Sequence, residues 1–540
     1  MTQATIVTAM STALLKSRAL LGLSAPAVRV EAHLPAGLPG FSTTGLKDTD
    51  VRERVKSAIQ NSNFDFPRGR IVVNLGPAEL DKRGGRYDLA IAAAILVASG
   101  QLPAATLATY DLLGELSLFG DVRGVRGALT ALRTAGADNR KLLLPSANAG
   151  ELTNARPDAV LEGVACISHL NGLRQPLRAY RPATIPPAPP ANSALSVATR
   201  EVPTTISATS AAAIDPDPLR DVVGQHLAKQ ALTIAAAGGH HMLMMGPPGA
   251  GKTMLAQRLA RLLPPLPAQA AQEVAEIYSI AGLPIPAAGA PLPAPFRAPH
   301  HSASAAALAG GGSYPQPGEV TLAHRGILFL DELPEFRRDA IEVLREPLEA
   351  GSIRIARRAG TIEYPARFQM IAAMNPCPVG RACKPSDCQC SPEQANRYQN
   401  KISAPIRDRI DLHVPVSRVP ISKLMGSTQP EHQPPGSKRD TEPNPAKEPS
   451  YRQIAAARAT QIERGCLNAH LDMNGIKNFC QPDQAGGELL AEVATQLALS
   501  ARAYYRTLRV ARTIADLARK ESIDEAAIAT ALSYRPPAPQ

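Results

Sequence analysis

Several classes of protein are excluded by what the chain lacks. Its 540 residues contain no tryptophan, and aromatic residues make up only 4%. The longest apolar run, residues 89–99, is far too short to cross a bilayer. Residues 1–15 lack the basic start and the apolar stretch of a signal peptide. We therefore expect a cytoplasmic protein with no place in a membrane.

Cysteine is also scarce, but four of the seven cysteines lie close together: Cys377, Cys383, Cys388 and Cys390. In a reducing compartment such a cluster binds metal more often than it forms disulfides. Four thiolates suit tetrahedral Zn²⁺, which would stabilise a loop too irregular to fold alone. The spacing is looser than that of paired C-x₂-C motifs, so a structural zinc site and four reduced cysteines in a surface loop both remain open. A catalytic zinc is not expected, because no histidine neighbours the cluster.

The overall composition suits a folded protein of several domains. Hydrophobic residues make up 44%, enough for a sizeable core, and the length suggests about two to four domains. The formal net charge is +11. Excess positive charge favours polyanions such as nucleic acid or anionic lipid, with a solvated basic surface as the equal alternative.

Residue patterns divide the chain into five segments. Apolar alternation at 27–31 and 70–75 predicts strands, and residues 52–60 and 87–99 predict helices, so the first segment is an α/β domain. Two tracts rich in proline and small polar residues cannot bury enough apolar surface to fold. The predicted segments are an α/β domain at 1–180, an extended linker at 181–214, a second α/β unit at 215–419, a disordered insertion at 420–449 and a helical tail at 450–540.

A phosphate-binding loop lies in the second α/β unit. Residues 241–245 predict a buried strand and residues 252–262 predict a helix. The loop between them matches G-x-x-x-x-G-K-[ST] in the strand–loop–helix context that this motif requires. Its glycines let backbone N–H groups face phosphates, Lys252 can reach the β- and γ-phosphates, and the Thr253 hydroxyl can ligate Mg²⁺. The expected ligands are ATP and Mg²⁺, bound by Gly246, Pro247, Pro248, Gly249, Ala250, Gly251, Lys252 and Thr253.

Two further predicted strands end in polar residues that suit hydrolysis. Residues 326–330 precede Asp331 and Glu332. From a strand end, Asp331 can hold Mg²⁺ through water, while Glu332 orients and polarises the attacking water. Residues 368–374 precede Asn375, which could help to position water near the γ-phosphate. The alternative for Asn375 is a residue that caps the following loop.

An arginine loop follows a short predicted helix at 393–402. In ring ATPases an arginine at this place enters the neighbouring subunit's site and stabilises transition-state charge. We favour Arg409 over Arg407 for this role. The alternative is an ion pair of the arginine with Asp408 or Asp411.

A second arginine candidate, Arg502, begins a predicted helix at 501–520. From the helical tail it could close onto the phosphates like a lid. Arg506 and Arg509 lie about one and two turns further along the same face, so the choice among the three stays open.

Five longer motifs follow one another along the chain: DVVGQ at 221–225, PFRAPHH at 295–301, PGEVTLAH at 317–324, AMNPC at 373–377 and VARTIADL at 510–517. On these motifs the chain resembles the magnesium-chelatase-like AAA+ ATPases, and among them the ComM/YifB subfamily. The resemblance covers nearly the whole chain apart from the linker and the insertion. It implies a P-loop α/β core with a helical lid and a homo-hexameric DNA helicase. It further implies branch migration on single-stranded and branched DNA during natural transformation, with recombination proteins as further partners.

One local feature fits a threaded polymer. Residues 352–356 and 361–364 predict two strands around Arg357 and Arg358. The pair resembles the hairpin that helicase-type AAA+ proteins point into the pore of their ring. Two arginines at its tip would suit phosphate contacts, and an exposed basic turn is the alternative.

The first domain resembles the protease domain of Lon, because residues 114–120 match its Gly-Glu strand. That protease needs a serine nucleophile and a lysine base. Where the serine should fall the chain reads GGRYD at 84–88, and where the lysine should fall it reads GAL at 127–129. We therefore expect no peptidase activity.

Three other functions compete with a DNA motor. A magnesium-chelatase-type motor acting on a protein or porphyrin partner is the main alternative, and the additional N-terminal domain speaks against it. A Lon-type protease lacks its catalytic pair. A scaffold that binds ATP without turnover is disfavoured, because Lys252, Asp331 and Glu332 are all present.

Overall fold

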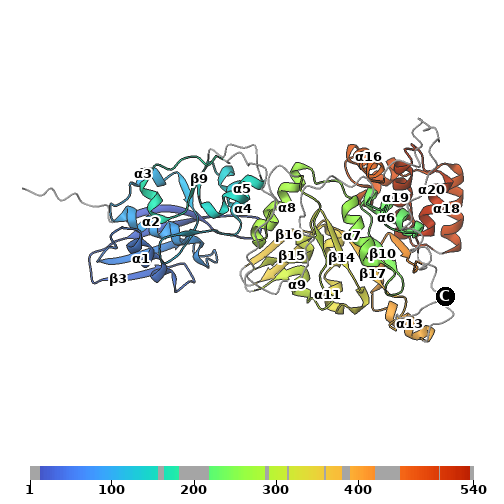
Figure 1. The fold of residues 1–540 in the computed structure, drawn as a ribbon, viewed down its shortest axis with the longest axis horizontal. Coiled ribbons are helices and arrows are strands. Elements are labelled where there is room, and N and C mark those ends of the chain that lie inside the picture. Colours follow the sequence, from blue (N-terminus) through green and yellow to red (C-terminus); the bar gives the residue numbers. More distant parts are fainter. Residues whose placement is uncertain are drawn as a thin grey trace, which may run out of the picture.

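A computed structural model describes residues 12–155, 163–181, 218–285, 291–312, 315–357, 360–379, 390–419, 450–497 and 499–535. Three parts follow one another along its long axis in Figure 1: an N-terminal α/β part, a central sheet with its helices, and a group of C-terminal helices. Apart from Arg181, the predicted linker at 181–214 lies outside the described residues, as does the predicted insertion at 420–449. No described helix is both long and apolar enough to span a bilayer.

The N-terminal part is built on a seven-stranded mixed sheet in the order β3-β4-β2-β1-β5-β8-β9. Its strands are β1 (Thr12–Arg18), β2 (Ala27–His33), β3 (Gly40–Thr44), β4 (Arg70–Gly76), β5 (Tyr110–Leu112), β8 (Lys141–Pro145) and β9 (Val164–Ile167). Helix α2 (Asp88–Ala98) is buried along its whole length and packs against β1 and β2. A helix that is apolar all round can be stable only inside a core. The predicted strands and helices of this part are confirmed to within a residue or two.

The remaining N-terminal elements cover and edge this sheet. They are α1 (Val51–Asn61), α3 (Ala104–Leu107), α4 (Ala128–Ala137), α5 (Ala149–Ala155), and a small hairpin of β6 (Glu115–Leu116) and β7 (Val122–Arg123), with short 3₁₀ turns η1 (Gly85–Tyr87), η2 (Ser146–Asn148) and η3 (Leu170–Arg174). Helix α1 packs on α2, whereas α4 and α5 face the central part of the molecule.

The central sheet has five parallel strands in the order β11-β14-β17-β10-β18. They are β10 (Met242–Met245), β11 (Phe296–Arg297), β14 (Ile327–Leu330), β17 (Gln369–Met374) and β18 (Leu412–Pro415). Every residue of β17 is buried, as expected for a strand covered on both faces. The register places Met245 opposite Met374, and Leu330 opposite Ala372. The residues after these strands therefore share one edge of the sheet.

Helices cover both faces of this sheet, and an additional hairpin stands at one end. The helices are α6 (His226–Gly238), α7 (Lys252–Leu262), α8 (Ala268–Ala281), α9 (Ala305–Ala309), α10 (Glu319–Leu322), α11 (Arg338–Glu342), α12 (Arg345–Ala350), α13 (Pro392–Gln399) and α14 (Ala404–Arg407), with turn η4 (Leu333–Glu335). Strands β15 (Ser352–Arg357) and β16 (Gly360–Pro365) pair antiparallel, as do β12 (Gly310–Gly311) and β13 (Gln316–Pro317). The helix predicted at 393–402 ends earlier, at Gln399.

The C-terminal part consists of helices, as predicted. They are α16 (Ser450–Glu463), α17 (Met473–Phe479), α18 (Gln484–Gln496), α19 (Ala501–Leu517) and α20 (Glu525–Ser533), with turn η6 (Asn468–His470). Asp472, Asp483, Ser500 and Asp524 each accept a backbone N–H at a helix start, which explains where four of these helices begin. Helices α16 and α19 pack on α6, so these helices share one hydrophobic core with a face of the central sheet.

The N-terminal part is docked on helix α8 of the central part. The N–H of Gly127 donates to the carbonyl of Ser279 across 3.0 Å. Arg133 Nε lies 3.1 Å from both carboxylate oxygens of Glu276. Farther along, a Cβ at Gly22 would come within 2.5 Å of Ile362 in β16. The two parts therefore meet through specific contacts at both α8 and the β15–β16 hairpin.

Candidate nucleotide site

The phosphate loop has the geometry that its sequence predicts. Strand β10 ends at Met245 and helix α7 begins at Lys252, as expected from the motif. The N–H of Gly246 donates to the carbonyl of Met374, and a Cβ at Gly246 would come within 2.1 Å of the Val416 carbonyl oxygen. Only glycine fits at this position, because any side chain would collide with that backbone atom.

Lys252 is held at the centre of the loop. Its side chain is 8% exposed, and its Nζ donates to the carbonyls of Gly246 and Pro247 across 2.7 and 3.1 Å and to Asn375 Oδ1 across 3.0 Å. Burial lowers the pKa of Lys252, and the charges of Asp331 and Glu332 oppose that shift. No carboxylate among the described residues forms an ion pair with this ammonium. Its charge is therefore available to an anion.

Asp331 and Thr253 meet at the edge of the sheet. Thr253 Oγ1 donates to Asp331 Oδ2 across 2.7 Å, and the N–H of Glu332 donates to Asp331 Oδ1 across 3.0 Å. A hydroxyl and a carboxylate are hard oxygen ligands of the kind that Mg²⁺ prefers. The residues present therefore fit a magnesium ion beside the phosphate loop.

Asn375 lies where a strand-end polar residue was expected, but its partner is a lysine. The sequence led us to expect Asn375 to help position water near the γ-phosphate, or to cap the following loop, and both roles stay predictions. In the structure its Oδ1 accepts from Lys252. Asn375 thus fixes the ammonium directly, because β17 and β10 are neighbours in the sheet.

Three residues of the site were not assigned by sequence reasoning. Gln225 Nε2 donates to the carbonyls of Ala250 and Ser417, and Arg418 donates to the carbonyl of Pro248. His301 Nδ1 lies 3.4 Å from Glu332 Oε2. Gln225 and His301 belong to the motifs at 221–225 and 295–301, which could have identified them as site residues. Nothing in the sequence distinguishes Arg418.

The two arginine candidates converge on one carboxylate. Arg409 Nη2 lies 2.7 Å and Arg502 Nη2 lies 3.4 Å from Glu349 Oε1. Arg409 is 5% exposed. The ion pair considered for it, with Asp408 or Asp411, is not the one that the structure shows.

The surroundings of Asp411 explain this difference. Asp411 accepts from the N–H of His241 and pairs with His240, and its nearest arginine is Arg506 at 3.7 Å. Arg502 is placed beside Arg409 and makes no hydrogen bond or ion pair with the described phosphate loop. The expectation that Arg502 closes onto the phosphates stays a prediction. Arg509 lies apart, donating to the carbonyl of Leu471.

The hairpin predicted around Arg357 and Arg358 is present as β15 and β16, with Arg357 paired to Gly360. The side chain of Arg357 and the whole of Arg358 lie outside the described residues. Their contact with a polymer stays a prediction.

The cysteine cluster is described only in part. Cys377 is buried and Cys390 is half-buried, while Cys383 and Cys388 lie outside the described residues. Within the described ranges no group of three or more His, Cys, Asp or Glu side chains is placed to hold a metal ion. The zinc site stays a prediction.

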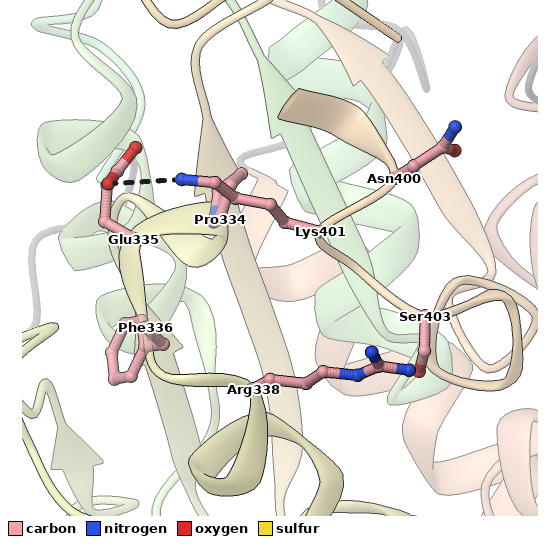
Figure 2. Close-up of a pocket in the computed structure, with 7 residues that line it drawn as sticks. All are labelled: Pro334, Glu335, Phe336, Arg338, Asn400, Lys401 and Ser403. Atoms are coloured by element: carbon pink, nitrogen blue, oxygen red, sulfur yellow. Dashed lines mark ion pairs between the residues drawn. The ribbon is translucent and has the colours of Figure 1, made fainter. Parts of the chain in front are cut away.

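A separate cavity of 410 Å³ lies behind the acidic strand end and is shown in Figure 2. Its lining residues come from the segment after Glu332 and from the loop between α13 and α14: Pro334, Glu335, Phe336, Arg338, Asn400, Lys401 and Ser403. Lys401 and Glu335 form an ion pair of 3.6 Å across it. It contains no residue of the phosphate loop, so it is distinct from the nucleotide site.

The parallel sheet, the strand–loop–helix and the acidic strand end define an AAA+-like P-loop protein. Matches to family models assign the chain more specifically. The model for magnesium chelatase subunit ChlI matches residues 218–424, that for subunit ChlI of Mg-chelatase matches 30–148, and that for the ChlI C-terminal part matches 447–535.

Relatives extend the match to nearly the whole chain. YifB of Salmonella typhimurium is 41% identical over 530 residues, which cover 97% of each chain. Competence protein ComM of Haemophilus influenzae is 40% identical over 533 residues, covering 97% of this chain and 98% of its own. The magnesium-chelatase 38 kDa subunit of Cereibacter sphaeroides is 28% identical over 177 residues, 30% of this chain and 53% of its own. The chain belongs to the ComM/YifB subfamily of magnesium-chelatase-like proteins.

Proposed function

We propose that this protein is an ATP-driven motor that acts on DNA. The observation that carries the ATPase part is the convergence of Lys252, Asn375, Thr253 and Asp331 at one edge of the parallel sheet. A buried ammonium that has no carboxylate partner among the described residues, with a hydroxyl–carboxylate pair beside it, forms a site for a nucleoside triphosphate with its metal.

The residues divide the work of hydrolysis. Lys252 and the N–H groups at the start of α7 hold the phosphates, and Asn375 keeps Lys252 in place. Thr253 and Asp331 would hold Mg²⁺, which neutralises charge on the phosphate oxygens when bound. Glu332, about half exposed at the strand end, orients the attacking water and takes its proton.

Arg409 and Arg502 have a role between subunits in this proposal. Both are held by Glu349 rather than by the phosphate loop of their own chain. An arginine that lies away from the phosphate loop of its own chain can act in the site of a neighbouring subunit in a closed ring, where it stabilises charge in the transition state. We propose a homo-hexamer assembled in this way, as the family resemblance implies.

Three observations support DNA as the polymer. A relative that covers nearly the whole chain carries the name competence protein. The net charge of +11 favours a polyanion. The β15–β16 hairpin carries Arg357 at its tip. We propose helicase action that promotes branch migration of incoming single-stranded DNA, with recombination proteins as partners.

A chelatase-type motor acting on a protein or porphyrin is the second candidate. It is favoured by the descriptions of the three matching family models. The relative named as a chelatase subunit, however, matches only 30% of this chain, against 97% for ComM. The DNA motor is therefore the better supported of the two.

The test is ATP hydrolysis by the purified protein, with and without single-stranded and branched DNA. We expect DNA to raise turnover. Lys252→Ala should abolish nucleotide binding and turnover, whereas Glu332→Gln should bind nucleotide and fail to hydrolyse it. Lys477→Ala, at an exposed lysine of α17, is the matched control and should behave as wild type. Turnover that ignores DNA at every salt concentration would reject the DNA motor and favour the chelatase-type candidate.

A further inference from the structure

One face of the N-terminal sheet is left open along β1, β2 and β4. Helix α2 packs on the other face and α1 packs on α2, so that Leu15, Val30 and Val73 are at most 2% exposed. Successive residues of a strand point to opposite sides, so the side chains between these buried positions form the open face. Leu14 is 58% exposed in the middle of β1, which shows that no described residue covers this part of it. The open face carries Leu14, Lys16, Arg29, Glu31 and Arg70.

Two cations of the open face stand directly opposite each other. The antiparallel register of β1 and β2 pairs Lys16 with Arg29. Side chains at opposed positions on one face lie about 5 Å apart at their Cβ atoms, and like charges at this distance destabilise the sheet. Neither side chain forms a hydrogen bond or an ion pair with another described residue. An anion bound between the two would relieve their repulsion.

The carboxylates near this pair do not neutralise it. Asp111 of β5 is in register with Lys16. Its two oxygens, however, accept from Arg18 Nε at 2.6 Å and from Arg140 Nε at 3.0 Å. Glu31 is the one acidic residue in β1, β2, β3 and β4, and its carboxylate accepts from a side-chain amide of β4 and forms no ion pair with a described cation. The open face therefore keeps an excess of positive charge.

Arg70 extends this positive charge along the sheet. It begins β4 opposite Gly40, is exposed and has no ion pair among the described residues. At the other end of β4, Arg29 is in register with Gly76, where a Cβ would lie 3.8 Å from Arg29 Nε. Arg70 is six positions from Gly76 in the same strand, so Arg29 and Arg70 lie on the same side of the sheet about 20 Å apart. That length matches about six phosphates along one strand of B-form DNA.

We propose that the open face is a second contact surface for DNA, with Lys16 and Arg29 on one phosphate and Arg70 farther along the same DNA strand. This inference rests on the proposed function, since it takes DNA as the polymer on which the motor acts. Cations spread along the direction of a β-strand suit a linear polyanion, and contacts to phosphates do not depend on base sequence. In this role the N-terminal part keeps DNA on the protein while the central part hydrolyses ATP.

The experiment measures the affinity of the whole protein for fluorescently labelled single-stranded DNA at several salt concentrations. We expect Lys16→Ala with Arg29→Ala to lower the affinity about tenfold at low salt and to reduce the slope of log K against log salt by about two. Arg70→Ala should reduce the slope by about one. Basal ATP turnover should stay unchanged in these variants, because none of the three residues contacts the phosphate loop.

Two further double variants serve as controls. Arg52→Ala with Lys56→Ala removes the same charge from exposed positions of α1, on the helix-covered side of the sheet, and should bind DNA as wild type does. Lys16→Arg with Arg29→Lys exchanges the two cations and should keep the wild-type affinity and slope. Thermal denaturation should give Lys16→Ala with Arg29→Ala a Tm no lower than that of wild type, because the change removes a like-charge pair.

The outcomes against the proposal are distinct from one another. Wild-type affinity and slope in Lys16→Ala with Arg29→Ala would overturn it. Equal losses in the α1 control would also overturn it, because they would show an effect of net charge alone. Retained DNA binding combined with lost binding to phosphatidylserine vesicles would assign the open face to an anionic membrane instead. If the wild type binds no DNA at any salt concentration, the proposed function itself fails, and the two failures are distinguishable.

Discussion

Asn375 accepts a hydrogen bond from Lys252 across 3.0 Å, although the two residues are 123 positions apart in the chain. The contact exists because β17 and β10 are neighbours in the sheet and end level with each other. It makes Asn375 the only described side chain that holds the ammonium of the phosphate loop, the other acceptors being backbone carbonyls.

Changes at Asn375 should therefore alter ATP binding. Asn375→Ala removes a hydrogen bond to a charged group, and we expect the affinity for ATP or the turnover to fall by about 10- to 100-fold. Asn375→Asp should lower the affinity further, because its carboxylate would form an ion pair with Lys252 and compete with phosphate. Titration with a fluorescent ATP analogue measures both effects. Equal affinities in Asn375→Asp and wild type would contradict this role.

A subunit-mixing experiment should reveal whether Arg409 acts on a neighbour. Lys252→Ala and Arg409→Ala should each be inactive alone. In an equal mixture half of the subunits keep the phosphate loop and half of those have a neighbour with Arg409, so about a quarter of wild-type turnover should return. A mixture as inactive as its components would show that Arg409 serves its own chain. Nucleotide binding should be unchanged in Arg409→Ala, since Arg409 makes no contact with the phosphate loop.

The contact between Arg133 and Glu276 should stabilise the docking of the N-terminal part. Glu276 is mostly buried, and without Arg133 its carboxylate keeps only Gln272 as a side-chain donor within the described part of the chain. We expect Arg133→Ala to cost about 1–2 kcal/mol, less than a fully buried pair, because Arg133 is 46% exposed. Chemical denaturation and limited proteolysis measure the effect.

Two variants make this test specific. The charge-swapped double variant Arg133→Glu with Glu276→Arg should recover part of the lost stability. The difference between its stability loss and the sum of the losses of the two single variants gives the coupling energy of the pair. Arg52→Ala, at an exposed arginine of α1 with no ion pair among the described residues, should leave stability unchanged. Equal losses in Arg52→Ala and Arg133→Ala would remove the case for a specific contact.

Acid should destabilise the central part through His241. Burial lowers the pKa of His241 to about 4, and its Nδ1 accepts from the N–H of Met370 across 3.0 Å, a bond that protonation would break. An unfolded histidine titrates near 6.5, so between these values the unfolded chain binds more protons. This contribution to stability is complete above about pH 6.5 and is lost as the pH falls toward 4, by about 1.4 kcal/mol per unit.

Denaturation curves between pH 4.5 and 7.5 test this dependence. Burial also lowers the pKa of His413 to about 4 and lowers the pKa values of His324 and His470, so the acid response of the wild type combines several contributions. His241→Asn keeps an acceptor for the Met370 N–H and cannot be protonated, so its slope should be shallower than that of wild type by about 1.4 kcal/mol per pH unit. A slope unchanged by His241→Asn would show that other groups control the acid response.

Much of the nucleotide site was predictable from the sequence, because it rests on short local patterns. The bounds of α7 and the ends of β10 and β14 agree with the expected ones, since an apolar strand, a glycine-rich turn and a helix start are each set within a few residues. Lys252, Thr253, Asp331 and Glu332 were assigned for the same reason. The helix predicted at 501–520 begins as expected at Ala501, where Ser500 accepts the N–H of Ala503 as an N-cap, and ends earlier, at Leu517.

The tertiary structure decided which residues from distant parts of the chain contact one another. Sequence alone gave no reason for Arg409 and Arg502 to share Glu349, or for His301 to reach Glu332, because each pair joins different elements. The ion pair of Arg409 with Asp408 or Asp411, which sequence proximity suggested as the alternative, is not the pair in the structure, because Arg409 pairs with Glu349 and Asp411 is engaged by the two histidines. Local preferences determine which element forms, whereas strand order, register and helix packing determine which distant side chains come within hydrogen-bonding distance.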